Sequence, residues 1–326
     1  MSFEAVRDPE IAVVVVNYNG RHLLDDCLRS IREHAEVQHE IVVVDNASTD
    51  GSLEYLATKS ADVKTVSSGT NLGFGKACNL GVKAARAPYV LLLNSDARLQ
   101  TSVRPALDHL RANPTAAAVG GRLWYLDGRL QPSVGLESTP ARLVLSWTGL
   151  GRIRCFPSIM RRMQMSGEYY TTPQNDVSWV SGALMLVERQ AWDNVGGMAP
   201  EYFMYMEDVD FCRRVRDAGR RVDYIPSIAA LHLEGGGREW IGERALCSTA
   251  DSYLEYARRY YSPAERVFLR GGLATVFALR SVAFLGLSAI GRGARRERGV
   301  AFLRAAARLI AGGDDRCRHE RVANRT

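Results

Sequence analysis

The sequence predicts an α/β fold with a mainly parallel central sheet, and three observations carry this prediction. Apolar runs at residues 11–16, 40–44 and 89–93 indicate buried strands, and the first of them is rich in β-branched residues. Residues 63–66 are expected to form a further strand, and a buried helix is the alternative for the run that begins at Tyr89. Apolar residues between these runs recur at helical spacing, for example Leu24, Leu28 and Ile31. Strands that alternate with helices in this way are typical of right-handed βαβ units.

The composition is that of an ordinary globular protein. The chain has 326 residues, of which 46% are hydrophobic and 24% are charged. This length is enough for one large α/β domain with appendages or for two small domains. Its six cysteines show no CxxC or CxxH spacing, so we expect reduced thiols without a zinc site or disulfide framework. Residues 2–10 lack an apolar core, so we expect no signal peptide.

Positive charge is concentrated near the C-terminus. Residues 258–326 contain 15 arginines and 5 acidic residues, a net charge of +10 against +6 for the whole chain. Arginines and paired glycines interrupt the apolar stretch 267–290, so we expect no transmembrane span there. We expect a basic helical extension over residues 241–312 that contacts a membrane surface, with ordinary helices packed on the body as the alternative. A disordered tail is expected over residues 313–326.

Polar residues follow the predicted strands at the points where the strands end. Asn17 and Asn19 follow the first strand, Asp45 the second, and Asn94-Ser95-Asp96 the run that begins at Tyr89. Right-handed crossovers place the carboxyl ends of parallel strands along one edge, where open α/β sheets bind ligands. We therefore expect a shared ligand crevice, in which Asp96 is suited to a divalent cation that holds a diphosphate. Each residue alone could equally turn the chain or cap a helix.

The glycine pattern argues against two common nucleotide-binding motifs. No GxGxxG follows the first strand, and the chain has no Walker A lysine loop. A nicotinamide-binding Rossmann domain and a P-loop domain are therefore not expected.

A second polar cluster lies between residues 200 and 240. Glu207, Asp208 and Asp210 fall within four positions after an aromatic and Met-rich stretch. Carboxylates suit the positive end of a helix, which would be a structural role. Crowding and partial burial also raise carboxylate pKa values, as a general base requires. Two short strands are expected over residues 222–225 and 228–231, leading to His232. His232 lies shortly before three glycines and is either structural or a ligand.

Two further segments receive weaker predictions. Residues 133–175 mix prolines, arginines and aromatic residues, and we expect an irregular insertion that is either a loop over an anionic acceptor or a solvated connection. Residues 177–187 are expected to form one strand, with Gly182 where a ligand can approach closely.

Taken in order, these motifs resemble those of the family 2 glycosyltransferases over residues 10–240. The resemblance implies the GT-A fold, a three-layer sandwich, with residues 1–240 as the catalytic domain and residues 133–175 as an acceptor-side insertion. Within the family, the chain is most similar to bacterial rhamnosyltransferases of cell-wall and O-antigen synthesis. The motifs are Val-Val-Asn17-Tyr-Asn19, Val-Val-Asp45-Asn-Ala-Ser-Thr-Asp50-Gly51-Ser, Asn71-Leu-Gly73-Phe, Leu-Leu-Asn94-Ser-Asp96, Trp179-Val-Ser-Gly182-Ala, Glu207-Asp208-Val-Asp210 and His232.

The resemblance also implies an activity. The enzyme would transfer a sugar with inversion from a dTDP- or UDP-sugar, with L-rhamnose from dTDP-rhamnose as the specific expectation. The acceptor would be a glycan or a polyprenyl-diphosphate-linked sugar, and the enzyme would be cytoplasmic and peripheral on the inner face of the cell membrane. Nucleic acid is not expected as a partner, and homo-oligomer formation is left open.

Roles follow from the resemblance position by position. Asp208 would be the catalytic base, with Glu207 beside it, and Asp45 would bind the nucleobase. Asp96, with His232, would hold Mg²⁺ or Mn²⁺; Asn94 replaces the first carboxylate of the family's Asp-x-Asp motif, so we expect the metal to arrive with the donor diphosphate. The donor-binding set is Asn17, Asn19, Asp45, Asn46, Asn71, Gly73, Asn94 and Ser95, and the acceptor-side set is Trp179, Gly182 and Asp210.

Two rival functions remain open on the sequence. A sugar-nucleotide nucleotidyltransferase would need a Gly-rich loop with Arg or Lys after the first strand, which the segment between Asn17 and Gly20 lacks. A non-catalytic module that binds membrane or nucleic acid would depend on the basic tail alone.

Overall fold

The computed structural model describes residues 8–60, 62–150, 157, 160–233, 242–288 and 293–312. The chain divides into two compact units. The first, here called the sheet unit, comprises residues 1–136, 163–200 and 207–237. The second, the helical unit, comprises residues 137–162, 201–206 and 238–326. The predicted tail over residues 313–326 lies outside the described residues.

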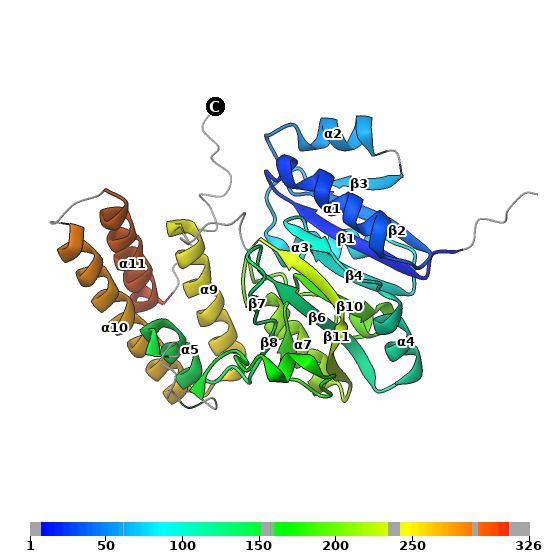
Figure 1. Cartoon of the computed structure of the whole chain (residues 1–326). Coiled ribbons are helices and arrows are strands. Elements are labelled where there is room, and N and C mark those ends of the chain that lie inside the picture. The colour runs from blue at the N-terminus through cyan, green and yellow to red at the C-terminus, as the bar shows by residue number, and fades with distance from the viewer. Residues whose placement is uncertain are drawn as a thin grey trace, which may run out of the picture. The chain divides into compact units, whose positions relative to one another are not determined.

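The elements of the sheet unit are shown in Figure 1. Its strands are β1 (Ile11–Asn17), β2 (His39–Asp45), β3 (Val63–Ser67), β4 (Tyr89–Asn94), β5 (Ala97–Leu99), β6 (Ala116–Trp124), β7 (Leu130–Gln131), β8 (Val134–Gly135), β9 (Trp179–Val180), β10 (Leu184–Glu188) and β11 (Arg221–His232). Its helices are α1 (Arg21–His34), α2 (Ser52–Lys59), α3 (Phe74–Ala84), α4 (Arg104–Ala112), the 3₁₀ helix η3 (Glu168–Thr171), α6 (Arg189–Asn194) and α7 (Glu207–Asp217).

Nine strands form the main sheet, in the order β3-β2-β1-β4-β10-β6-β11-β5, with β7 paired to β6. The four N-terminal strands are parallel to one another, as the βαβ pattern predicts. Strand β10 runs antiparallel to both β4 and β6, so the complete sheet is mixed.

Helices cover both faces of this sheet, which confirms the predicted three-layer α/β fold. On one face, Leu24, Leu28 and Ile31 of α1 pack with alternate residues of β1 in a core that also includes α4. On the other face, α3 approaches so closely that a Cβ at Gly81 would lie 2.4 Å from Cγ1 of Val14. The continuous apolar runs of β1, β2 and β4 reflect this burial on both sides, because a strand covered on both faces needs apolar residues at successive positions.

The register of the parallel strands aligns their polar ends. Asn17 pairs with Asp45, Asp45 pairs with Ser67, and Val16 pairs with Asn94. The carboxyl ends of four strands therefore meet along one edge of the sheet, as the sequence predicts.

Three segments differ from their predicted structures. Residues 133–175 are not irregular throughout, since Thr139 accepts a hydrogen bond from the backbone N of Arg142 and caps a helix that has Pro140 in its first turn. Residues 177–187 form β9 and β10 with a turn at Gly182 rather than one strand. Two strands expected over 222–225 and 228–231 form the single strand β11, whose register shifts around Pro226, which lacks the amide that a regular ladder requires.

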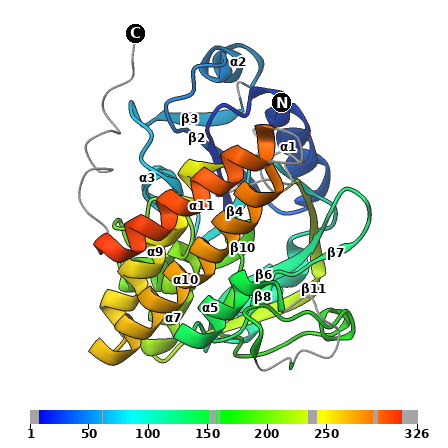
Figure 2. The ribbon, with the colours of Figure 1, turned by 90° about the vertical axis from the view of Figure 1, so that its left-hand side faces the viewer.

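The helical unit contains α5 (Pro140–Thr148), α9 (Glu243–Tyr260), α10 (Pro263–Ser288) and α11 (Gly293–Ala311), and α10 and α11 lie side by side (Figure 2). Aromatic rings form its core. Trp147 makes an edge contact with Phe277 at 5.0 Å, and Phe302 contacts both rings. The indole N–H of Trp147 also donates to the hydroxyl of Tyr253 at 3.2 Å.

Helix α10 differs from the expectation that the C-terminal segment contains no membrane-spanning stretch. Residues 263–287 are long and apolar enough to cross a bilayer, by length and composition alone, with a mean hydropathy of 1.5. A core helix of a soluble protein can satisfy the same criteria, but only 28% of the most apolar window is buried here. The interrupting arginines turn inward, because Arg270 donates to the carbonyls of Leu309 and Ile310, and Arg280 to that of Trp147.

An ion-pair cluster fixes the start of the sheet. Two nitrogens of Arg104 contact the carboxylate of Glu10 at 3.0 and 2.9 Å, and Arg111 contacts it at 2.8 Å. The hydrogen bond from Arg104 is the main cause that lowers the pKa of Glu10 from 4.5 to about 2. A lowered folded-state pKa stabilises the protein above the unfolded value and loses this effect as the pH falls through the folded value.

We expect Glu10→Gln to lower the free energy of unfolding by about 1 kcal/mol at pH 7, a figure reduced for solvent screening. The difference from the unsubstituted protein should shrink as the pH falls from 4.5 to about 2. Urea unfolding at several pH values measures this, with Glu33→Gln on the exposed face of α1 as the control. A difference independent of pH would contradict the assignment.

Candidate functional site

Two loops at the strand ends are joined by buried polar groups. The side-chain amide of Asn17 donates to Oδ1 of Asp45 at 3.3 Å and to the hydroxyl of Ser48 at 3.1 Å. The other oxygen of Asp45 accepts from the backbone N of Ser48 at 3.0 Å. Asn17 and Asp45 are fully buried, so both residues hold the two loops together and do not line an open surface.

Asn19 links the same two loops at the surface. Its backbone N donates to the Ser48 hydroxyl at 2.9 Å, and its side-chain oxygen accepts from the backbone N of Thr49 at 2.7 Å. Asn19 has a φ of +51°, a left-handed conformation that Asn tolerates better than most residues. The preceding Tyr18 is 49% exposed, so this turn presents an aromatic ring to solvent beside the strand ends.

A third loop, before α3, is held by Asn46. Its side-chain oxygen accepts from the backbone N of Leu72 at 2.9 Å, and its nitrogen donates to the side chain of Asn71 at 3.0 Å. Asn71 in turn accepts from the backbone N of Gly73 at 3.0 Å. Gly73 has a φ of +82° and a ψ of 174°, a conformation restricted almost entirely to glycine. These three predicted donor-binding residues thus fix the loop that begins α3.

Asn94, Asp96 and His232 meet at the next strand end. Nε2 of His232 lies 3.1 Å from Nδ2 of Asn94 and 3.2 Å from Oδ1 of Asp96. The pairing of Ala97 with His232 across β5 and β11 produces this contact. Ser95 lies beside the β1–α1 loop, since its hydroxyl is 3.5 Å from the position that a Cβ on Gly20 would take.

This group has the donor atoms that a small divalent cation requires. Two ligands bound at right angles, each about 2.1 Å from Mg²⁺, lie about 3 Å apart, close to the 3.2 Å between His232 and Asp96. The side-chain oxygen of Asn94 is buried and has no hydrogen-bond partner among the residues that the structure describes. In the described part of the chain, no group of three or more His, Cys, Asp or Glu side chains is arranged so that it could hold a metal ion. The protein would therefore supply only part of a coordination sphere.

Asp208 lies at the start of α7 and is connected to the same strand end. Its Oδ2 accepts from the backbone N of Gly182 at 3.1 Å. The next carbonyl, that of Ala183, accepts from the backbone N of Asn94 at 3.2 Å. A short path of backbone hydrogen bonds thus fixes Asp208 relative to Asn94. Asp208 is partly exposed, as a group that meets a substrate must be.

Glu207 faces inward, unlike its neighbour. It is 5% exposed, and its Cβ lies 3.4 Å from the position that a Cβ on Gly75 of α3 would take. Burial, followed by the charges of Glu207 and Asp208, raises the pKa of the Cys78 thiol on α3. The two carboxylates therefore differ in exposure, and only Asp208 combines proximity to Gly182 with access to solvent.

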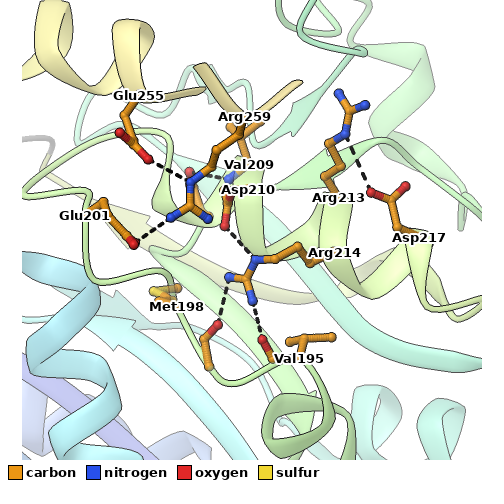
Figure 3. A network of polar contacts seen from close by, with 12 residues as sticks. Val195, Met198, Glu201, Val209, Asp210, Arg213, Arg214, Asp217, Glu255 and Arg259 are labelled. Atoms are coloured by element: carbon orange, nitrogen blue, oxygen red, sulfur yellow. Dashed lines mark hydrogen bonds and ion pairs between the residues drawn. The ribbon is translucent and has the colours of Figure 1, made fainter. Parts of the chain in front are cut away.

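Asp210 has contacts that differ from the expected acceptor-side role. It is fully buried, and its Oδ2 accepts from Nε of Arg214 at 2.7 Å. Arg214 also donates to two backbone carbonyls of the loop after α6, that of Val195 (Figure 3) and that of Gly197, the latter at 2.8 Å. Breaking such a buried pair leaves an uncompensated charge, so this geometry supports a structural function for Asp210.

Trp179 is likewise more enclosed than an acceptor platform would be. Its indole is 5% exposed, and its N–H donates to the carbonyl of Leu136 at 3.0 Å. The ring lies over Gly135, where an added Cβ would fall 1.7 Å from Cε2 of the indole. Gly182, the third residue of this set, is buried, and its backbone N donates to Asp208.

We expect Gly135→Ala to destabilise the protein by about 1–3 kcal/mol, because the indole of Trp179 must move to admit the methyl group. Urea unfolding measures the change. Gly167→Ala is the matched control, since that glycine has open space around its Cβ position and a φ of −60°, and its effect should stay within about 0.5 kcal/mol. Equal stabilities for the two variants would contradict the contact.

Sequence reasoning missed two residues of the site. Ser48, which joins Asn17, Asn19 and Asp45, lies in the predicted loop after the second strand, and its proximity to Asp45 was the available signal. The side-chain oxygen Oε1 of Gln131 lies 3.1 Å from Nδ1 of His232. It is separated from His232 by 101 positions, and no local pattern indicates the contact.

The fold is that of the GT-A glycosyltransferases. The solved mannosyltransferase PcManGT from Pyrobaculum calidifontis, in complex with GDP-Man and Mn²⁺, matches 95% of this chain and 88% of its own with a TM-score of 0.52 and 18% identity. The chain is also 31% identical over 289 residues to N-acetylglucosaminyl-diphospho-decaprenol L-rhamnosyltransferase of Mycobacterium tuberculosis, covering 83% of this chain and 91% of that protein.

A shorter similarity, 43% identity over 56 residues, relates it to rhamnosyltransferase WbbL of Escherichia coli and covers 17% of this chain and 21% of that protein. The family profile described as glycosyl transferase family 2 matches residues 12–172. The protein belongs to this family, and it is a glycosyltransferase, as the motifs in the sequence predict.

Proposed function

We propose that the enzyme transfers L-rhamnose from dTDP-rhamnose, with inversion, to a sugar linked to a polyprenyl diphosphate in cell-wall polysaccharide synthesis. The observation that carries the catalytic part is the backbone connection from Asp208 through Gly182 and Ala183 to Asn94. This connection supports the proposal that a catalytic base and a site for the donor diphosphate lie at the same end of the sheet. The sugar and the acceptor rest on the names of the mycobacterial and E. coli relatives.

Asp208 is proposed to accept the proton of the attacking acceptor hydroxyl. The acceptor oxygen then bonds to the anomeric carbon while the bond from that carbon to the donor diphosphate oxygen breaks. Because attack and departure occur on opposite faces, one displacement inverts the anomeric configuration. A positioned base of this kind typically contributes about 10²–10⁴-fold to the rate. Glu207, packed beneath it, is proposed to support the orientation of Asp208.

Asp96 and His232 are proposed to hold Mg²⁺ or Mn²⁺, with the amide oxygen of Asn94 as a neutral neighbour. When bound, such a cation neutralises the charge that develops on the leaving diphosphate. The small number of protein ligands supports a metal that binds together with the donor, since magnesium sites commonly combine one or two carboxylates with substrate phosphates.

The three tied loops are proposed to form the nucleoside site, with Tyr18 as its exposed ring. Asp45 retains free lone pairs on both oxygens, which suit the N3–H of uracil or thymine. Because Asp45 is fully buried, a base could reach it only after the link between Asn17 and Ser48 shifts. A hydrogen bond from N3–H does not distinguish dTDP from UDP, because thymine and uracil both carry this group.

The proposal is tested by offering dTDP-rhamnose, UDP-glucose and UDP-GlcNAc with Mg²⁺ to the purified enzyme and a polyprenyl-diphosphate-linked GlcNAc. We expect a rhamnosylated lipid product of inverted configuration. Transfer of another sugar would overturn the donor assignment alone, and transfer only to a lipid-free glycan would overturn the acceptor assignment. Release of pyrophosphate from a nucleoside triphosphate would favour the nucleotidyltransferase alternative.

We also propose that the enzyme is cytoplasmic and peripheral on the inner face of the membrane, held through the helical unit. The exposed face of α10 supports this, because Phe268, Leu279 and Val282 are 54%, 65% and 69% exposed. Arg270 and Arg280 of α10 donate to carbonyls of Ile310 and Trp147 within the helical unit, while Arg295 and Arg296 at the start of α11 are exposed. An apolar face bordered by cations fits a lipid surface with anionic headgroups.

Replacing both Leu279 and Val282 by Glu should lower the fraction of enzyme bound to phosphatidylglycerol-containing vesicles by about ten-fold, because charge at the apolar face opposes insertion. Co-sedimentation measures this. The control Gln100→Glu with Gln190→Glu adds the same charge at exposed positions of the sheet unit and should change binding little. Equal loss in both variants would indicate a general charge effect and contradict the assignment to α10.

A further inference from the structure

Gln131 lies directly behind the imidazole of His232. It ends β7, where the pairing of Leu123 with Gln131 and of Leu123 with Ala230 brings β7 and β11 to either side of β6. Gln131 is 5% exposed, and its side-chain oxygen Oε1 lies 3.1 Å from Nδ1 of His232. The opposite ring nitrogen, Nε2, faces Asn94 and Asp96. The imidazole is therefore held between a buried amide and the candidate metal ligands.

We propose that Gln131 is a positioning residue that keeps the proton of neutral His232 on Nδ1. An amide oxygen only accepts hydrogen bonds, so Nδ1 must be the donor in this contact. Nε2 then retains its lone pair, and a metal binds an imidazole only through an unprotonated nitrogen. The amide of Asn94, whose Nδ2 lies 3.1 Å away, donates to the same lone pair when no cation is bound. This inference rests on the proposed metal function of His232.

The opposite orientation of the Gln131 amide makes a distinct prediction. With the nitrogen toward His232, Nδ1 would accept and the proton would move to Nε2, where it would point at Oδ1 of Asp96. That tautomer cannot bind a cation through Nε2. Oδ1 of Asp96, at 3.2 Å, could accept this proton. The amide nitrogen of Asn94, at 3.1 Å, would then face a second donor, and this contact opposes the Nε2 tautomer.

Two-dimensional ¹⁵N–¹H spectra of the full-length protein decide between the tautomers without any substitution. Spectra are recorded without metal at a pH where histidine is neutral, above about 8, and the His232 signals are assigned by their loss in His232→Gln. We expect the proton on Nδ1 in the unsubstituted protein and a redistribution between both nitrogens in Gln131→Leu. A proton on Nε2 in the unsubstituted protein would overturn the inference.

Binding of Mn²⁺ in the presence of saturating dTDP supplies the second measurement. Loss of a hydrogen-bond partner behind a metal-bound histidine typically weakens metal binding about 10–100-fold, and we expect this for Gln131→Leu. Gln131→Glu, which keeps an acceptor at the same place, should bind within about three-fold of the unsubstituted protein, or more tightly. If Gln131 only fills space, the Leu and Glu variants should bind Mn²⁺ with equal affinity, and this result would overturn the inference.

The two failures can be separated. If the unsubstituted protein binds no Mn²⁺ with dTDP, the metal part of the proposed function fails, and the spectra alone decide the tautomer. If it binds Mn²⁺ and the Leu variant binds equally well, only the function of Gln131 is refuted. Circular dichroism establishes that each variant is folded, and Gln131→Met, which is close to Gln in length, replaces the Leu variant if that one does not fold.

Discussion

Asp208→Asn should lower the rate of sugar transfer by about 10³-fold while the affinity for the nucleotide sugar changes less than about two-fold. The amide keeps the shape and can still accept from the backbone N of Gly182 through its oxygen, but it cannot accept a proton from the acceptor hydroxyl. Single-turnover kinetics measures the transfer step, and isothermal titration with the donor measures binding.

Asp217→Asn is the matched control for this prediction. Asp217 lies at the other end of the same helix, 63% exposed, with Arg213 as its ion-pair partner at 3.7 Å, so it should leave both quantities nearly unchanged. Figure 3 shows that pair. Near-normal transfer by the Asp208 variant would refute the base assignment, and a parallel loss of donor binding would instead indicate a structural function.

Asp96→Asn should weaken the binding of Mn²⁺ with dTDP by at least about 100-fold, since loss of a direct ligand costs more than the 10–100-fold typical of an outer partner. Transfer should fall by a similar factor, because the charge on the leaving diphosphate is no longer neutralised. Excess chelator should abolish transfer by the unsubstituted enzyme.

Asp127→Asn, in the exposed turn between β6 and β7, is the control and should bind and react normally. Full activity in excess chelator would refute the proposed metal function altogether. Chelator sensitivity with normal metal binding by the Asp96 variant would place the cation elsewhere in the site.

Much of the fold was predictable because local chemistry determines it. The apolar runs that end at Asn17, Asp45 and Asn94 predicted strands buried on both faces, and the helical segments between them favoured parallel pairing. Parallel pairing in turn brings these three residues to one edge, as the observed register confirms. The same reasoning identified the family, since its motifs lie in the loops that follow these strands.

The sequence could not predict which polar and aromatic side chains are exposed, or which residues they contact. Glu207, Asp208 and Asp210 form a continuous acidic motif, but the helix that carries them turns Asp210 toward Arg214 and leaves Asp208 at Gly182. Trp179 was expected beside the acceptor, whereas the absence of a side chain at Gly135 lets it pack inward. Each outcome depends on which face of an element meets a neighbour that is distant in sequence.

The sequence by itself therefore determined the α/β architecture, the edge of the sheet that carries the polar loops, and the family. These follow from hydrophobic periodicity and from loop residues close together in the chain. The tertiary structure alone decided that α10 turns its arginines inward and that Gln131 lies behind His232. Such contacts join residues about 40 to 130 positions apart, and only the packing of strands and helices brings them within hydrogen-bonding distance.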